Sequence, residues 1–206
     1  MTAAIVLAGG ASTRFGGDKL AAELDGRPLV EHALMAVAQV ADRLVVVLAP
    51  GADAPGLPPG LAGRTLVARD AALHGGPLAG IEAGLGALAA ESATGAVRDE
   101  PVLVVGGDMP RLVPAVLRLL LATLEADPGC AAVSLEAEPR ATLPMAVRPG
   151  PALAAATQLL AADRRSLIGL LERLEGVTIP EAAWRALDPD GGTLVDVDSP
   201  GDLAGA

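Results

Sequence analysis

Residues 5–19 of the chain read IVLAGGASTRFGGDK, an apolar run followed by a glycine-rich segment that ends in a lysine. Lys19 is the only lysine of the sequence, and the other 14 basic residues are all arginine. Lysine carries a compact charge on a flexible stem, whereas arginine presents a broad planar fork. A compact charge suits a crowded site where phosphate oxygens lie against the backbone. The apolar run therefore predicts a strand, and the segment after it predicts a loop that binds the phosphates of a nucleotide.

This loop offers both backbone and side-chain groups to an anion. Gly9 and Gly10 lack Cβ atoms, so the backbone can come close to a ligand and its N–H groups can face phosphate oxygens. Ser12, Arg14 and Lys19 strengthen the interpretation, because two of the three are cations. The spacing of the glycines matches neither a Walker A loop nor a dinucleotide-binding fingerprint. For the glycines taken alone, a tight turn without a ligand is the alternative.

Strand-like and helix-like patterns alternate along the chain. The expected strands are residues 3–8, 44–48, 64–68, 102–105, 131–135, 145–148 and 194–197, and the expected helices are residues 29–41, 78–91, 114–126, 151–160 and 166–174. Several strands are continuously apolar, as strands buried on both faces of a parallel sheet are. The alternation predicts an α/β fold, a three-layer sandwich with a mostly parallel, Rossmann-like sheet. We expect a single domain over residues 1–206, with ligands at the carboxyl ends of the strands.

The charge and composition of the chain argue against several classes of function. The net charge is −10, from 15 basic and 25 acidic residues, which disfavours nucleic acid as a partner because phosphate backbones require a basic face. No apolar stretch is long enough for a transmembrane helix, and the N-terminus lacks the basic region of a signal peptide. Cys130 is the only cysteine, which excludes an internal disulfide and a zinc–cysteine cluster. We therefore expect a cytoplasmic protein with no membrane or nucleic-acid partner.

Two aspartates are candidate metal ligands. Asp108 follows the fourth expected strand, and Mg²⁺ is commonly held by one or two carboxylates that bridge to substrate phosphates. The alternative is that Asp108 caps the turn after the strand. Asp196 and Asp198 alternate near the C-terminus, so they share one face of an expected strand. Asp198 is either a second metal ligand or part of the cap of a helix that begins after Ser199.

The segment RDAALHGGPLAG, residues 69–80, is the candidate base-binding loop. Asp70 can accept hydrogen bonds from the amine and ring N–H of guanine, and Gly76 lets the chain approach a flat base. Pro77 can open the helix that follows. An ordinary strand-to-helix turn accounts for the same residues, and we interpret His74 as a solvated loop residue.

Covalent catalysis has little support in the sequence. Cys130 has apolar neighbours, and a chain whose only histidines are His32 and His74 suggests no Ser/His/Asp grouping. The expected mechanism is therefore direct transfer, in which positioned groups stabilise the developing charge.

With these motifs in view, the chain resembles the molybdenum cofactor guanylyltransferase family, within the nucleotidyltransferases of glycosyltransferase-A-like Rossmann fold. The resemblance runs along nearly the whole chain and rests on residues 7–19, 24–32, 76–80, 107–110 and 196–203. It implies a sheet of the nucleotide-diphospho-sugar transferase type and an Mg²⁺-dependent enzyme. The implied reaction transfers GMP from GTP to the terminal phosphate of molybdopterin and releases pyrophosphate.

The resemblance and the residues described above give the expected roles at the site. Lys19, Asp108 and Arg14 are the expected catalytic residues, and Asp108 and Asp198 are the expected metal ligands. By its motifs, the family places Asp108 at Mg²⁺ and phosphate, Lys19 at phosphate, and Asp70 at guanine. The expected nucleotide-binding residues are Leu7, Ala8, Gly9, Gly10, Lys19, Asp70, Gly76, Pro77 and Asp108.

Alternatives of the same class and of a different class stay open. A cytidylyltransferase for molybdopterin, or a nucleotidyltransferase for another small phosphate, would use the same fold and chemistry. A non-catalytic nucleotide-binding module would use the phosphate loop without a metal at Asp108. The expected partners are small-molecule substrates, with transient contacts to other proteins of molybdenum cofactor biosynthesis. Arg164 and Arg165 either hold the pterin phosphate or form a surface ion pair with Asp163 or Glu172.

Overall fold

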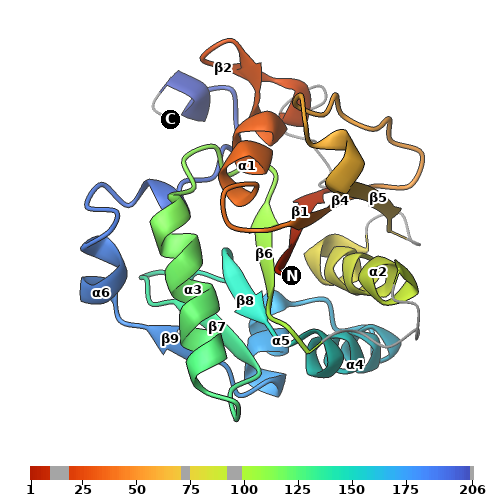
Figure 1. Ribbon diagram of the computed structural model, residues 1–206, viewed down its shortest axis with the longest axis vertical. Coiled ribbons are helices and arrows are strands. Elements are labelled where there is room, and N and C mark those ends of the chain that lie inside the picture. Colours follow the sequence, from red (N-terminus) through yellow and green to blue (C-terminus); the bar gives the residue numbers. More distant parts are fainter. Residues whose placement is uncertain (10–18, 71–74, 92–98, 205–206) are drawn as a thin grey trace.

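The structure is a computed structural model and describes residues 1–9, 19–70, 75–91 and 99–204. Within these residues, its centre is a seven-stranded sheet in the order β5-β4-β1-β6-β8-β7-β9 (Figure 1). The strands are β1 (Ala3–Ala8), β4 (Arg43–Leu48), β5 (Thr65–Arg69), β6 (Val102–Gly106), β7 (Ala132–Leu135), β8 (Met145–Val147) and β9 (Val177–Ile179). β8 runs antiparallel to β6 and β7, whereas the other neighbouring pairs are parallel. The expected α/β fold with a mostly parallel sheet is confirmed.

Helices cover both faces of this sheet. They are α1 (Leu29–Val37), α2 (Gly76–Glu91), α3 (Pro114–Ala126), α4 (Pro149–Ala161), α5 (Leu167–Arg173) and α6 (Glu181–Arg185). Side chains of α1, α3 and α6 enter the core on one face, and side chains of α2, α4 and α5 enter it on the other. The three layers are therefore those that the sequence predicts. None of the helices in the described residues combines the length and the apolarity needed to cross a bilayer.

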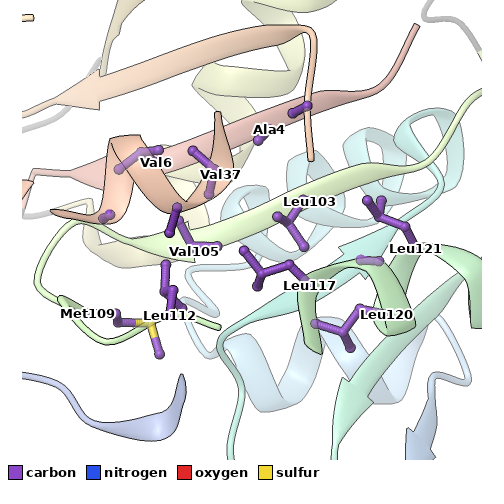
Figure 2. Close-up of a cluster of buried hydrophobic side chains, with 14 of the residues drawn as sticks. Ala4, Val6, Val37, Leu103, Val105, Met109, Leu112, Leu117, Leu120 and Leu121 are labelled. Atoms are coloured by element: carbon purple, nitrogen blue, oxygen red, sulfur yellow. The ribbon is translucent and has the colours of Figure 1, made fainter. Parts of the chain in front are cut away.

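The central strands are buried on both faces because successive side chains point in opposite directions. Val6 of β1 and Leu103 and Val105 of β6 lie on the face where Val37 of α1 and Leu117 of α3 pack (Figure 2). Their neighbours in sequence, such as Ile5 and Val104, belong to the core under α2 and α4. This arrangement explains why β1, β4 and β6 read as continuous apolar runs and not as alternating ones.

Close packing of α2 on β1 depends on two glycines one helical turn apart. A Cβ added to Gly80 would lie 3.0 Å from Cδ2 of Leu7, and one added to Gly84 would lie 2.9 Å from Cγ2 of Ile5. Real Cβ atoms essentially never show the contact at Gly84, so a larger residue there would force a shift, and a Cβ at Gly80 would be tightly packed. The two glycines thus bring α2 close to β1 along its length.

A small hairpin and the C-terminal segment form a separate cluster at one end of the molecule. β2 (Glu23–Leu24) and β3 (Arg27–Pro28) are joined by Asp25 and Gly26, whose φ angles of 51° and 75° are those of a tight hairpin turn. Leu24, Leu29 and Val197 are buried together beside this hairpin. In Figure 1 the C-terminal end accordingly lies next to β2, at the top of the view.

The expected strand at 194–197 is wrong. A short 3₁₀-helix, η3, covers Gly192–Leu194, and the residues after it are extended but join no sheet. The N–H group of Val197 instead donates a hydrogen bond to the carbonyl oxygen of Asp108, at 3.0 Å. The side chain of Val197 is buried against the hairpin, whereas Leu194 packs at the edge of the core that α1 and α3 cover.

Candidate functional site

Three charged side chains from distant parts of the chain meet at the carboxyl edge of the sheet. The ammonium group of Lys19 donates hydrogen bonds to Oδ2 of Asp108 at 2.9 Å and to Oδ1 of Asp198 at 2.7 Å. β1 and β6 are parallel neighbours, so the segments that follow them leave the sheet at the same edge. The structure therefore brings together Lys19, Asp108 and Asp198, the three described residues with expected catalytic or metal-binding roles.

Asp108 is held by a tight turn at the end of β6. The N–H group of Gly107 donates to the carbonyl oxygen of Leu7 at 2.9 Å, and a Cβ at Gly107 would lie 3.1 Å from that same oxygen. Met109, on the other side of Asp108, is buried in the core cluster that includes Leu112 and Val105 (Figure 2). Its sulfur accepts a hydrogen bond from the N–H group of Gly106. Asp108 is therefore fixed on both sides, by a backbone contact and by a buried side chain.

Asp198 is held by a turn in the C-terminal segment. The carboxylate of Asp202 accepts hydrogen bonds from the N–H groups of Asp198 and Ser199, at 2.9 and 2.7 Å. These bonds to backbone N–H groups lower the pKa of Asp202, because they stabilise its charged form. Asp198 was expected either to bind a metal or to help cap a helix. In the structure the carboxylate that accepts the backbone N–H groups of this turn is that of Asp202. The carboxylate of Asp198 is used for the contact with Lys19.

The electrostatic environment of Lys19 favours its charged form. Burial alone lowers the pKa of Lys19, but the hydrogen bonds and negative charges of Asp198 and Asp108 outweigh it, so the pKa is raised. The Lys19 side chain is only 13% exposed, whereas the Asp108 and Asp198 side chains are 31% and 58% exposed. The cation is therefore enclosed, and both carboxylates keep a surface that a ligand can reach.

A third carboxylate, Asp196, belongs to the same electrostatic system. Its pKa is raised first by desolvation from the surrounding protein and then by the negative charges of Asp198 and Asp108. The sequence signal for this residue was its position two before Asp198, which in extended backbone places the two side chains on the same face. In the sequence Asp196 stands out only as a neighbour of Asp198, and the structure adds it to the charge balance of the candidate site.

The two carboxylates that pair with Lys19 fit the ligand set of Mg²⁺. This ion prefers oxygen ligands, and proteins usually supply one or two carboxylates while substrate phosphates and water supply the rest. Among the described residues, no group of three or more His, Cys, Asp and Glu side chains is arranged to hold a metal ion. Asp108 and Asp198 thus match a site completed by a phosphate ligand and not an all-protein metal cage.

Asp70 lies at the start of α2. Its N–H group donates to the carbonyl oxygen of Leu48 at 3.0 Å, so Asp70 continues the edge formed by β4 and β5. A Cβ on Gly75 would contact both carboxylate oxygens of Asp70, which therefore lie directly against the backbone before α2. The positive end of a helix dipole favours a carboxylate at this place. Gly76 and Pro77 form the first turn of the same helix.

The other expected nucleotide-binding residues lie at the carboxyl end of β1 or outside the described residues. Leu7 and Ala8 are the last two residues of β1. A Cβ on Gly9 would lie 3.0 Å from the backbone nitrogen of Ala49, a tight contact, so glycine suits the close passage of the chain at the end of β4. Gly10 and Arg14, like His74 in the candidate base-binding loop, lie outside the described residues.

The structure places Arg164 and Arg165 in the turn between α4 and α5. Arg165 forms an ion pair with Asp163 at 3.1 Å, which is one of the two arrangements considered for it. Ser166 caps α5, because its Oγ atom accepts a hydrogen bond from the N–H group of Gly169. The local contacts of this turn are thus those of an ordinary helix connection.

A surface groove lies elsewhere on the molecule. Its lining comes from α4, α5 and the segment between α3 and β7, and includes Cys130, Gln158 and Arg173. It contains none of the residues that the sequence singles out for nucleotide or metal. We therefore define the candidate site by the converging charges at the carboxyl edge and not by the depth of a groove.

Comparisons with known proteins show the family of the chain. Residues 4–179 match the family model described as a MobA-like NTP transferase domain. The chain is 33% identical to a probable molybdenum cofactor guanylyltransferase of Chloroflexus aggregans, over 98% of this chain and 92% of the relative. It is 38% identical to a 2-C-methyl-D-erythritol 4-phosphate cytidylyltransferase of Ralstonia nicotianae, over 66% of this chain and 55% of that protein.

The fold has a close counterpart among solved structures. The crystal structure of molybdopterin-guanine dinucleotide biosynthesis protein A from Archaeoglobus fulgidus superposes with a TM-score of 0.76 at 25% sequence identity. The match covers 99% of this chain and 95% of that one. The resemblance found in the sequence motifs is therefore matched by the fold over nearly the full length of both chains.

Proposed function

This chain belongs to the family of MobA-like NTP transferase domains, and from that membership we propose that it is a molybdenum cofactor guanylyltransferase. The proposed reaction moves GMP from GTP to the terminal phosphate of molybdopterin and releases pyrophosphate. The nucleotidyltransferase class, with a nucleoside triphosphate as a small-molecule substrate, follows from the family itself. Near-full-length similarity to a relative named a probable molybdenum cofactor guanylyltransferase supports guanine as the base and molybdopterin as the acceptor.

The convergence of Lys19, Asp108 and Asp198 is the observation that carries this proposal. Phosphoryl-type transfer depends on positioning and on neutralising the charge of phosphate oxygens, with little covalent chemistry from the protein. One enclosed cation beside two accessible carboxylates supplies groups for both tasks at the edge where such folds bind ligands. A module that only binds nucleotide has no need for the second carboxylate.

Each of these residues has a proposed role in the transfer. Asp108 and Asp198 would hold Mg²⁺, which supplies charge neutralisation at the phosphate oxygens. Lys19 binds the phosphate oxygens that leave as pyrophosphate, and Arg14 together with backbone N–H groups after Gly9 adds to that binding. Asp70, near the first turn of α2, is the proposed partner of the guanine edge.

The bond changes balance without a general base. An oxygen of the acceptor phosphate attacks the α-phosphorus, and the bond from the α-phosphorus to the bridging oxygen breaks on the opposite side. The electron pair of that bond leaves with pyrophosphate, whose charge Lys19 stabilises. A phosphate monoester is already an anion at neutral pH, since its second pKa is about 6. No residue therefore has to remove a proton from the nucleophile.

A cytidylyltransferase is the second candidate, supported by the similarity to the Ralstonia nicotianae enzyme. That similarity spans 55% of the relative, whereas the guanylyltransferase similarity spans 92% of its relative. We favour guanine because the longer match covers both the base-binding loop and the C-terminal segment that carries Asp198. The two candidates share the fold and the mechanism and differ in the base.

Pyrophosphate release with each nucleoside triphosphate tests the proposal. The protein is incubated with Mg²⁺, molybdopterin and GTP, CTP, ATP or UTP in separate reactions. We expect release with GTP and little with the others. Release with CTP alone would replace the guanylyltransferase by a cytidylyltransferase. Absence of release with all four would contradict molybdopterin as the acceptor.

A further inference from the structure

The ammonium group of Lys19 lies between the two carboxylates proposed as metal ligands. It is 2.9 Å from Oδ2 of Asp108 and 2.7 Å from Oδ1 of Asp198, so both distances are those of strong charge-assisted hydrogen bonds. Mg²⁺ binds carboxylate oxygens at about 2.1 Å. An ion held by both carboxylates would need the oxygens that the ammonium now contacts.

Lys19 and a divalent cation therefore compete for one position. Two cations this close to each other repel, and the pair of carboxylates cannot satisfy both at hydrogen-bonding and coordination distance. Lysine is suited to giving way, because its charge sits at the end of a flexible four-carbon stem. The backbone that carries the two carboxylates, in contrast, is held by the turn at Gly107 and by the hydrogen bonds that Asp202 accepts.

We propose that Lys19 occupies the cation position of the nucleotide-free protein and that the metal–triphosphate complex displaces it onto the phosphate oxygens. This inference rests on the proposed function, because it concerns the same site. It predicts that metal binds weakly without nucleotide, since it must first displace an ion-paired lysine. It also predicts that metal and triphosphate favour each other's binding, because the phosphates give Lys19 a new partner.

Binding of Mn²⁺ to the nucleotide-free protein tests this exchange directly. Free Mn²⁺ is measured by electron paramagnetic resonance in titrations of the full chain and its variants. We expect Lys19→Met to increase the affinity for Mn²⁺ by about tenfold, because two ion pairs that oppose metal binding are removed. Lys19→Arg keeps the charge and should stay near the unsubstituted protein. Lys19→Gln, which is more polar than the Met variant, should show the same gain as Lys19→Met and serves if the latter does not fold.

Two controls separate competition from a general change of charge. Arg173→Met removes one positive charge in the remote groove, where Arg173 contacts Gln158, and should leave Mn²⁺ affinity unchanged. Adding Asp108→Asn to Lys19→Met should abolish the gain if the gain arises at this pair of carboxylates. An equal or lower affinity in both Lys19→Met and Lys19→Gln overturns the inference, and so does a gain that Asp108→Asn leaves intact.

The outcome is independent of whether the proposed reaction is correct. The Mn²⁺ titration contains neither nucleotide nor acceptor, so it reports only on the competition at the carboxylates. Failure of the proposed function would appear instead as no pyrophosphate release by the unsubstituted protein with GTP and molybdopterin. A protein can fail either experiment while passing the other.

Discussion

The carboxylate of Asp202 accepts a hydrogen bond from the backbone N–H group of Asp198, at 2.9 Å. This contact fixes the turn from which the side chain of Asp198 reaches Lys19, and a second bond from Ser199 strengthens it. The C-terminal segment, which joins no sheet, thus supplies a charged group to a site built on the central strands.

Loss of Lys19 should reduce turnover strongly without unfolding the protein. Removing one preorganised group that stabilises developing charge typically costs about 10²–10³ in kcat. We expect a loss of that size for Lys19→Ala, and at least as large a loss for Asp108→Ala. Steady-state rates of pyrophosphate release give the values, with Arg173→Ala in the remote groove as a control that keeps its activity. Near-normal turnover in both site variants would show that the site lies elsewhere.

The pKa of Lys19 can be measured without assignment, because the chain has a single lysine. Protein labelled with ¹³Cε-lysine should give one resonance, whose titration midpoint lies above the ordinary value of 10.5. Since the folded-state pKa is raised, the stabilisation is present below pH 10.5 and is lost as the pH rises through the folded-state value. Asp198→Asn should move the midpoint down. A midpoint that this variant leaves unchanged would contradict the ion pair.

The Asp202 contact should weaken in acid. The pKa of Asp202 is lowered from 3.8, so its contribution is present above that pH and is lost as the pH falls through the folded-state value. We expect Asp202→Ala to lower thermal stability slightly at pH 7, because the carboxylate is fully solvated, and to make a smaller difference in acid below pH 3.8. Turnover at pH 7 should fall less than in Lys19→Ala, because the effect on Asp198 is indirect. Melting curves of the variant and the unsubstituted protein, recorded at pH 7 and in acid, measure this difference. An equal difference at both pH values would contradict the contact.

Two glycines of α2, one packed against β1 and one facing open space, allow a matched test of how the helix contributes to stability. A Cβ on Gly84 would lie 2.9 Å from Ile5, whereas a Cβ on Gly86 would have nothing within 4 Å. Gly84→Ala should therefore cost about 1–3 kcal/mol through overpacking. Gly86→Ala should stabilise the helix by about 0.5–1 kcal/mol, because alanine is the better helix former. Urea unfolding measures the change in the free energy of unfolding for each variant. The two changes should have opposite signs if α2 packs on β1 as described, and equal signs if it does not.

The parts of the fold set by apolar strands could be predicted from the sequence. β1, β4 and β6 are buried on both faces, and a continuous apolar run is what that environment requires. β9 could not be predicted, because it has only three residues and two of them are exposed. Residues 194–197 form no strand for a related reason, since the side chain of Val197 packs against a hairpin that local patterns do not reveal.

For the candidate site, the sequence predicts at which edge of the sheet the residues lie, but it does not predict which side chains contact one another. Because parallel strands end at one edge, Asp108 and the segment after β1 were expected to lie close together, and the structure brings Asp108 to Lys19. The partnership of Lys19 with Asp198 spans 179 positions and depends on how the C-terminal segment crosses the loop after β6. No local pattern carries that information, because it arises from tertiary packing alone.

Transfer of the α-phosphate is the measurement that tests the central claim most directly. The protein is incubated with Mg²⁺, molybdopterin and GTP that carries ¹⁸O at the non-bridging oxygens of its α-phosphate, and the separated products are identified by mass spectrometry. We predict that the label leaves GTP and appears in a molybdopterin–GMP adduct, with one unlabelled pyrophosphate for each adduct. Label that stays in GTP, or that appears only as free GMP, would contradict guanylyl transfer to molybdopterin.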